Sequence, residues 1–151
     1  MSDPFHFTNT TARLGLPYLF PGQAQKEFMF NETLTRLDFL VNPAVHGQIA
    51  SPPDSPPAGA MFIVAPDGVG LFAGHEGMLA CWDGQQWTFL APQSGMTVFD
   101  ANDGSRWRFT GDWIQANPPA LPEGGQVVDQ EARTALSALI GALQDAGIFS
   151  R

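Results

Sequence analysis

Four aspartates in the central part of the chain are the residues whose type and position could support a reaction. Each lies at a turn or a strand end of a predicted β region, where loops can converge. Glycan hydrolysis uses two carboxyl groups that face each other across the scissile bond, so a pair of these aspartates could perform it. Aspartate also stabilises turns at such positions, and this role accounts for all four without any reaction. We therefore predict no catalytic residue. The four are Asp83, Asp100, Asp103 and Asp112.

Tryptophan offers a second kind of chemistry, because its flat apolar face suits the stacking of sugar rings. The chain has four tryptophans, all close to polar turn residues. Small sheets also use tryptophan to fill a thin core, and we expect at least two of the four to do so. Trp87 and Trp113 lie nearest the tips of two predicted hairpins, close to Asp83 and Asp112. These four residues form our predicted glycan-binding site, which makes an adhesin the alternative to a purely structural protein.

The sequence gives little support to metal or thiol chemistry. His6, His46 and His75 are far apart, and none has the spacing of a metal-binding motif. The single cysteine, Cys81, lies in a strand-like run, which favours a small buried residue over a reactive thiol. We therefore expect neither a metal nor another cofactor.

The balance of charge limits the partners that the protein can have. Fifteen acidic residues stand against seven basic ones, and the formal net charge is −8. Nucleic acids and anionic lipids are bound by clustered Lys and Arg, so we expect neither as a partner. The first residues show no basic segment followed by an apolar one, and no stretch of about eighteen apolar residues occurs. We therefore predict neither a signal peptide nor a membrane span, and expect synthesis in the cytoplasm.

An amphipathic helix is predicted over residues 24–41. Its apolar residues are spaced 4, 3 and 4 apart, which places them on one face, and we expect this face to pack on a small sheet. The proline of Asn42-Pro43 pushes the preceding residue out of the α region and ends the helix. Glu27 and Asn31 share another face, where we expect them to satisfy backbone groups of loops or to contact another subunit. The apolar residues are Phe30, Leu34, Leu37 and Val41.

Short apolar runs separated by turn signals fill the middle of the chain. Asp-Gly pairs between such runs are good hairpin signals, because glycine tolerates positive φ. We therefore predict one small antiparallel meander, and together with the helix an α+β fold. The predicted strands cover residues 45–50, 61–65, 69–74, 78–82, 86–91, 96–100, 105–110 and 112–114.

A second helix is predicted at the C-terminus, within 128–148, after a Pro/Gly-rich linker at 116–127. Asp129 is a suitable N-cap and Gly147 a suitable stop. Its apolar residues repeat at 4, 3, 4 and 3, which is the spacing of a coiled-coil seam. A helix this short is not stable alone in water, so its apolar face must pack on the sheet, on the first helix or on copies of the chain. We favour self-association or docking on a partner. The predicted contact residues are Leu136, Leu139, Ile140 and Leu143, with Phe5 and Phe7 of an extended arm at 1–13.

The run GQAQKEFMFNETLTRLDFLV at residues 22–41 resembles the opening of a family of uncharacterised domains, DUF2793. The similarity continues through SPPDSPPAGAMFIV, WDGQQWTFLAPQSGMTVFD and RFTGDW, and covers roughly residues 12–115. We accordingly place the domain at 14–115. Members of this family occur in spike, fibre and tail-associated proteins of tailed phages and of phage-like gene transfer agents of alphaproteobacteria.

The resemblance implies a structural protein of a virion or virus-like particle. Such a protein would form symmetric homo-oligomers, contact other virion proteins, and link the particle to a receptor-binding fibre or to the host cell surface. A head spike would need fivefold symmetry and a tail fibre threefold. An adhesin that recognises host capsular polysaccharide is the alternative, and a capsule hydrolase is the weakest of the three hypotheses.

Overall fold

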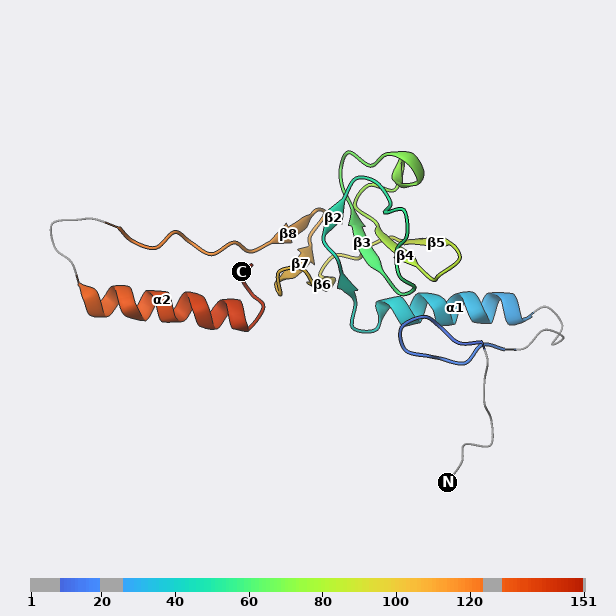
Figure 1. The fold of residues 1–151 in the computed structure, drawn as a ribbon, viewed down its shortest axis with the longest axis horizontal. Helices are drawn as coiled ribbons and strands as arrows, with labels where there is room; N and C mark the ends of the chain where they lie inside the picture. The colour runs from blue at the N-terminus through green and yellow to red at the C-terminus, as the bar shows by residue number, and fades with distance from the viewer. Residues whose placement is uncertain (1–8, 20–25, 124–128, 151) are drawn as a thin grey trace, which may run out of the picture. The chain divides into compact units, whose positions relative to one another are not determined.

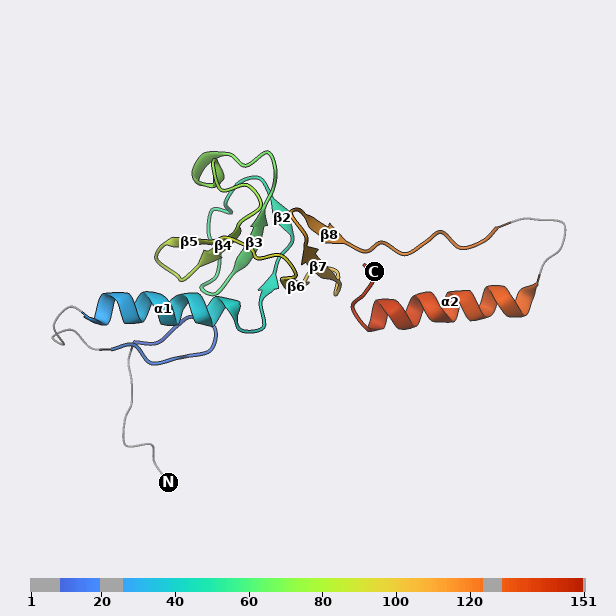
Figure 2. The same ribbon diagram turned by 180° about the vertical axis from the view of Figure 1, so that it is seen from behind.

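The computed structural model describes residues 9–19, 26–123 and 129–150. Two compact units make up the protein: unit 1 comprises residues 1–43 and 48–92, and unit 2 comprises residues 44–47 and 93–151. The described residues form two helices and two four-stranded sheets (Figure 1), and Figure 2 shows them from behind. The predicted α+β class is confirmed. The predicted single antiparallel meander is wrong, because each unit has its own sheet and each sheet contains one parallel pair.

The sheet of unit 1 has the strand order β2-β3-β4-β5. Its first two strands are parallel and the others antiparallel. The turn between the last two is held by Asp83, whose carboxylate accepts hydrogen bonds from the backbone N–H groups of Gln85 (2.7 Å) and Gln86 (2.8 Å). The strands are β2 (Gln48–Ile49), β3 (Met61–Val64), β4 (Leu79–Trp82) and β5 (Trp87–Leu90).

The core of unit 1 lies around β3, whose four residues are all buried. Phe72 is also fully buried, and its ring meets the rings of Trp87 and Phe89 edge-on, with centroids 5.2 and 5.9 Å away. Phe72 ends a 3-10 helix, η1 (Gly70–Phe72), in the segment where we predicted a strand at 69–74. That prediction is wrong because Gly70 adopts a φ of 62°, which turns the chain out of an extended path.

Helix α1 (Lys26–Leu40) confirms the first predicted helix, but its orientation was not expected. Phe30, Leu37 and Val41, which we predicted to pack on the sheet, are exposed. Asp38 and Phe39 are buried instead. The prediction failed because a segment outside the helix, residues 9–19, supplies polar partners to an adjacent face, which carries Asn31, Thr35 and Asp38. Helix α1 and this segment lie side by side in Figures 1 and 2.

The sheet of unit 2 has the order β1-β6-β7-β8, and β1 is parallel to β6. The predicted strand at 45–50 is divided between the two sheets at Gly47, whose φ is 85°. Beside the buried side chains of Val45 and Val98, this unit holds a buried carboxylate, Asp100, which accepts a hydrogen bond from the indole Nε1 of Trp107 at 2.9 Å. The strands are β1 (Ala44–Val45), β6 (Thr97–Asp100), β7 (Arg106–Phe109) and β8 (Trp113–Gln115).

Helix α2 (Gln130–Asp145) has the ends that the sequence predicted. The Asp129 side chain accepts a hydrogen bond from the backbone N–H of Ala132 at 2.9 Å. At the other end the chain turns at Gly147, whose φ is 67°. The guanidinium of Arg106 on β7 donates a hydrogen bond to the Ala146 carbonyl at 2.7 Å, which ties the C-terminal end of the helix to the sheet of unit 2.

Candidate functional site

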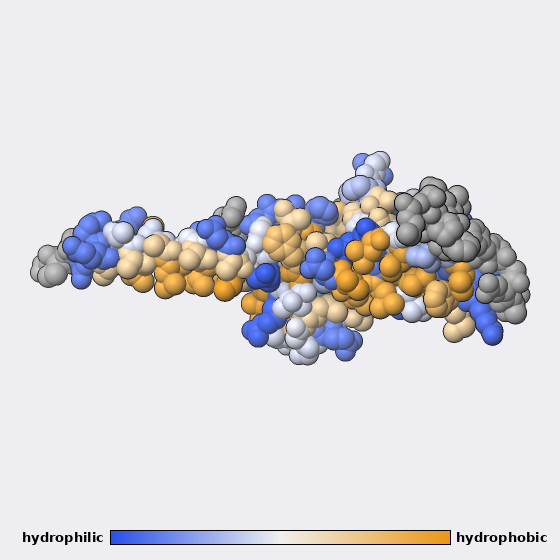
Figure 3. Space-filling model, turned by 90° about the horizontal axis from the view of Figure 1, so that it is seen from below, coloured by the Kyte–Doolittle hydropathy of each residue, from blue (hydrophilic) through white to orange (hydrophobic). Residues whose placement is uncertain are grey.

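The apolar stripe of α2 is uncovered. Helix α2 has no buried residue, and Leu136 and Leu139 are 46% and 55% exposed. Ile140 and Leu143, the other two predicted contact residues, are half-buried. Figure 3 shows the resulting apolar band along the helix. The predicted contact residues of α2 therefore do lie together on one accessible surface, which we call the α2 stripe.

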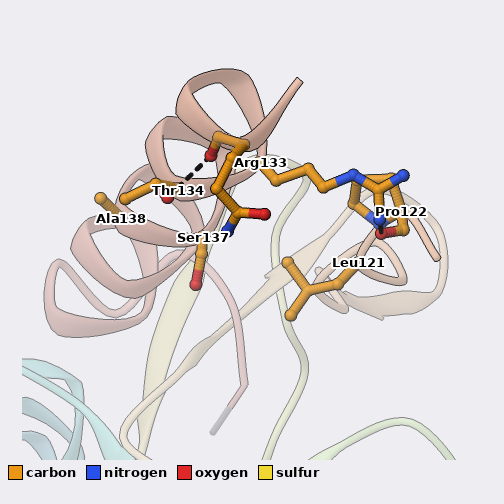
Figure 4. Close-up of a pocket in the computed structure, with 7 residues that line it drawn as sticks. Leu121, Pro122, Arg133, Thr134, Ser137 and Ala138 are labelled. Carbon is orange, nitrogen blue, oxygen red and sulfur yellow. Dashed lines mark hydrogen bonds between the residues drawn. The ribbon is translucent and has the colours of Figure 1, made fainter. Parts of the chain in front are cut away.

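The chain covers a different face of the same helix. Leu121 and Pro122 of the linker lie against α2 and enclose a shallow pocket of about 480 Å³ (Figure 4). The Arg133 guanidinium donates a hydrogen bond to the Pro122 carbonyl at 2.9 Å. At about 100° of rotation per residue, the centre of this face lies about 140° from that of the α2 stripe, and Arg133 stands near the border between the two. Leu121 and Pro122 thus cover the polar side of the first half of the helix. The helix residues that line the pocket are Gln130, Arg133, Thr134, Ser137 and Ala138.

The borders of the α2 stripe carry little charge. Ala135 and Ala142 border it on one side and Arg133 on the other, while the acidic residues Glu131 and Asp145 point well away from it. The chain as a whole has a net charge of −8, so most of its surface would repel a second copy. The α2 stripe is a place where two copies can meet without bringing carboxylates together.

Helix α1 presents a second apolar surface while polar contacts hold its inner face. The Asn31 side chain accepts a hydrogen bond from the backbone N–H of Leu19 at 2.9 Å and donates one to its carbonyl at 3.2 Å. The Tyr18 and Thr35 hydroxyl groups are 2.5 Å apart. The expectation that Asn31 satisfies backbone groups of a loop is confirmed. Its predicted neighbour Glu27 has a buried carboxylate oxygen, Oε2, for which the described part of the chain provides no hydrogen-bond partner.

The C-terminal end of α1 is joined to residues 9–19 by Arg13 and Asp38. The Asp38 carboxylate accepts hydrogen bonds from the backbone N–H groups of Arg13 (2.8 Å) and Leu14 (2.6 Å). The Arg13 guanidinium donates to the carbonyls of Asp38 (2.9 Å), Phe39 (3.1 Å) and Asn42 (3.0 Å). These carbonyls belong to the last turn and exit of the helix, where no intrahelical N–H is available. One arginine therefore caps the helix and fixes the neighbouring loop.

The residues of the predicted glycan site fall in separate units. Trp87 and Asp83 belong to unit 1, and Trp113 and Asp112 belong to unit 2. Trp87 is half-buried among the core aromatics, and Trp113 is half-buried with its ring 5.3 Å from that of Phe109. Sugar binding by these residues stays a prediction. Phe5 and Phe7 of the predicted arm lie outside the described residues.

The other candidate chemical groups have structural roles where they are described. Hydrogen bonds from Ser105 and Gln115 outweigh the effect of partial burial and lower the pKa of Asp103. Burial raises the pKa of the Cys81 thiol to about 12, so this buried cysteine stays protonated. His75 stacks on Phe89 with ring centroids 3.7 Å apart. Among the described residues, no three His, Cys, Asp or Glu side chains are grouped to hold a metal ion.

A groove of about 700 Å³ in unit 1 escaped the sequence analysis. It is bordered by the segment 9–19, by the first two thirds of α1 and by the hairpin that joins β4 to β5. The hairpin is more than forty residues from the other two segments in sequence, and no motif marks the three as neighbours. Its lining residues are Asn9, Thr10, Tyr18, Leu19, Glu27, Phe28, Asn31, Glu32, Thr35, Gln85, Gln86 and Thr88.

These features define a small two-unit α+β protein with accessible apolar stripes on its helices. Neither described helix is long and apolar enough to span a membrane. The family described as "Protein of unknown function (DUF2793)" matches residues 30–114, and the chain belongs to this family. The match includes most of α1 and both sheets except the last residue of β8, and it ends before α2. No curated protein and no solved structure matches the chain.

Proposed function

We propose that the protein is a structural, homo-oligomeric component of a phage or gene-transfer-agent particle, acting as a spike or fibre protein. It would link the particle to a receptor-binding fibre or to the host cell surface. The observation that carries the proposal is the uncovered α2 stripe. Its placement in a particle is supported by the resemblance of the chain to domains of spike, fibre and tail-associated proteins.

A second copy of the chain is the occupant that best fits the α2 stripe. The heptad-like spacing lets two or more identical helices interdigitate their apolar side chains. Small flanking residues allow close approach, and no carboxylate borders the contact. Full burial of a Leu or Ile side chain contributes about 1.5–3 kcal/mol, so completing the burial of four partly exposed residues in each copy would stabilise an oligomer appreciably. Closed symmetry would repeat this contact in every subunit.

The enzymatic alternative has weaker support from the geometry. Asp83 holds the β4–β5 turn, Asp100 binds the indole of Trp107, and Asp103 binds Ser105 and Gln115. Each of these carboxylates already has a structural partner. A capsule hydrolase would need two carboxyl groups facing a common groove, and none of these aspartates lines the groove of unit 1.

The test is to locate the protein in particles released by the bacterium that encodes it. A tagged chain should co-purify with phage-like particles through a density gradient and should be labelled on them by immunogold electron microscopy. The tagged variant Leu136→Asp/Leu139→Asp should be produced at the same level and be absent from the particles, because it cannot assemble. Particles that contain no tagged wild-type chain would contradict the proposal.

A further inference from the structure

The groove of unit 1 has unused hydrogen-bonding capacity. The side chains of Asn9, Gln85, Gln86 and Thr88 line it, and none of them makes a hydrogen bond to another residue that the structure describes. Amide groups present a donor and an acceptor side by side, and a hydroxyl offers both in one group. The groove can therefore pair with a ligand that also carries donors and acceptors close together.

Glu27 adds a carboxylate to the lining of this groove. Its carboxylate oxygen Oε2 is buried and has no hydrogen-bond partner among the residues that the structure describes, although buried polar atoms normally have one. The second carboxylate of the lining, Glu32, is paired with Arg36 at 2.6 Å. No lysine or arginine is among the described lining residues. An acidic ligand would thus meet uncompensated negative charge, whereas a hydroxyl group could donate to Glu27.

An aromatic side chain completes the groove. Phe28, in the first turn of α1, lines it and is 75% exposed. An exposed phenyl face beside amides and a carboxylate provides the apolar platform and the polar edge that a sugar ring needs. The volume of about 700 Å³ lies within the range of ~300–1,000 Å³ common for small-molecule sites.

We propose that this groove binds a short, uncharged oligosaccharide. The sugar stacks on Phe28, exchanges hydrogen bonds with Gln85, Gln86 and Thr88, and donates a hydroxyl hydrogen to Glu27. The site differs from the tryptophan site that the sequence suggested, because neither Trp87 nor Trp113 is among its described lining residues. It also does not depend on assembly, since all its residues belong to unit 1 of one chain.

The test begins with the full chain on an array of immobilised oligosaccharides. The neutral probes are gluco-, galacto-, manno- and N-acetylglucosamine oligomers, and the acidic probes are uronate and sialate oligomers. We expect binding to at least one neutral probe and weaker binding to the acidic ones. The affinity for the best neutral probe is then measured in solution by calorimetry. Absence of binding to any neutral probe, or a preference for acidic ones, would overturn the proposal.

Variants then locate the site. Phe28→Ala and Gln86→Ala should each weaken binding roughly tenfold, equivalent to about 1.4 kcal/mol. The matched controls Leu71→Ala and Gln48→Ala change exposed residues of the same unit outside the groove and should leave the affinity unchanged. Unchanged amide NMR spectra outside the groove would show that each variant is folded. Unchanged sugar affinity in both groove variants would contradict a sugar site here. Loss of sugar binding when a lysine-rich peptide competes for the protein would also contradict it.

The variant Leu136→Asp/Leu139→Asp separates this inference from the proposed assembly. It should lose self-association and keep the same affinity for the soluble oligosaccharide per chain. Loss of sugar binding in this variant would show that the site requires several copies and would contradict the single-chain groove.

Discussion

The two helices both leave an apolar stripe accessible, but different contacts hold them in place. Helix α1 buries Asp38 and Phe39 and is fixed by a polar inner face that pairs with residues 9–19. Helix α2 buries nothing and is held by its N-cap, by the linker on its polar side and by Arg106 at its C-terminal end. In both helices, apolar residues that repeat at helical spacing are exposed and do not pack into the core. In this small protein it marks surfaces available to other molecules.

The largest expected effect comes from placing charges on the α2 stripe. Leu136→Asp/Leu139→Asp puts two carboxylates in each copy at the proposed contact, so the oligomer should dissociate, with the association constant falling by at least ~100-fold. Sedimentation over a range of concentrations measures this change. The control Ser137→Asp adds one charge on the linker side and should leave association intact. Equal weakening by both changes would show that the stripe is not the contact.

Arginine substitutions test how α1 is held. Arg13→Ala removes the hydrogen bonds to the carbonyls at the end of the helix, and we expect the free energy of unfolding to fall by about 2 kcal/mol. Arg36→Ala removes only the exposed pair with Glu32 and should cost at most ~0.5 kcal/mol. Chemical denaturation followed by tryptophan fluorescence compares the two. A similar loss for both would mean that Arg13 does not anchor the helix.

The buried thiol of Cys81 should make the free energy of unfolding depend on pH in alkaline solution. Burial raises its pKa from the ordinary 9.0 to about 12, so above pH 9 the unfolded chain loses this proton while the folded protein keeps it. The contribution of this thiol to the free energy of unfolding is fully present below pH 9 and is lost as the pH rises toward 12. The free energy of unfolding then falls by up to about 1.4 kcal/mol per pH unit. Denaturation of wild type and of Cys81→Ala at several alkaline pH values measures the difference. Parallel pH curves for the two would contradict a buried, protonated thiol.

Apart from the control substitutions, the smallest effect is expected in the first turn of α2. Asp129→Ala removes the side-chain acceptor of the Ala132 N–H and should lower helix stability by about 1 kcal/mol. Because α2 buries no residue in its own chain, we expect its amide protons to exchange faster while those of the unit 1 sheet are unaffected. Hydrogen exchange measured by mass spectrometry distinguishes the two regions. Asp129→Asn, which keeps a capping oxygen, should retain most of the protection.

Local signals allowed much of the fold to be predicted. The Asp-Gly turns gave the positions of β3 to β7 within one or two residues, and Asp129 and Gly147 gave the ends of α2. The division into two sheets could not be predicted, because it depends on the parallel pairs β1–β6 and β2–β3, which join segments distant in sequence. The sequence also did not predict which face of α1 is turned inward. That face is determined by contacts with residues 9–19, which lie outside the helix.

The candidate surfaces were predictable to different degrees. The α2 stripe follows from the spacing of residues within one helix, and these residues lie together in the structure. The groove of unit 1 depends on three segments whose side chains have no common spacing, so the sequence offered no sign of it. The turn-forming role predicted for Asp83 is confirmed. It could be predicted because an Asx turn is formed by neighbouring residues alone.

The measurement that tests the central claim most directly is the mass of the protein in solution by light scattering. The full chain and a chain ending at Gly125, which lacks α2, are compared at the same concentrations. We predict an integer multiple of the monomer mass for the full chain and a monomer for the shortened one, and the multiple would indicate threefold or fivefold symmetry. A monomer in both cases would contradict self-assembly through the α2 stripe.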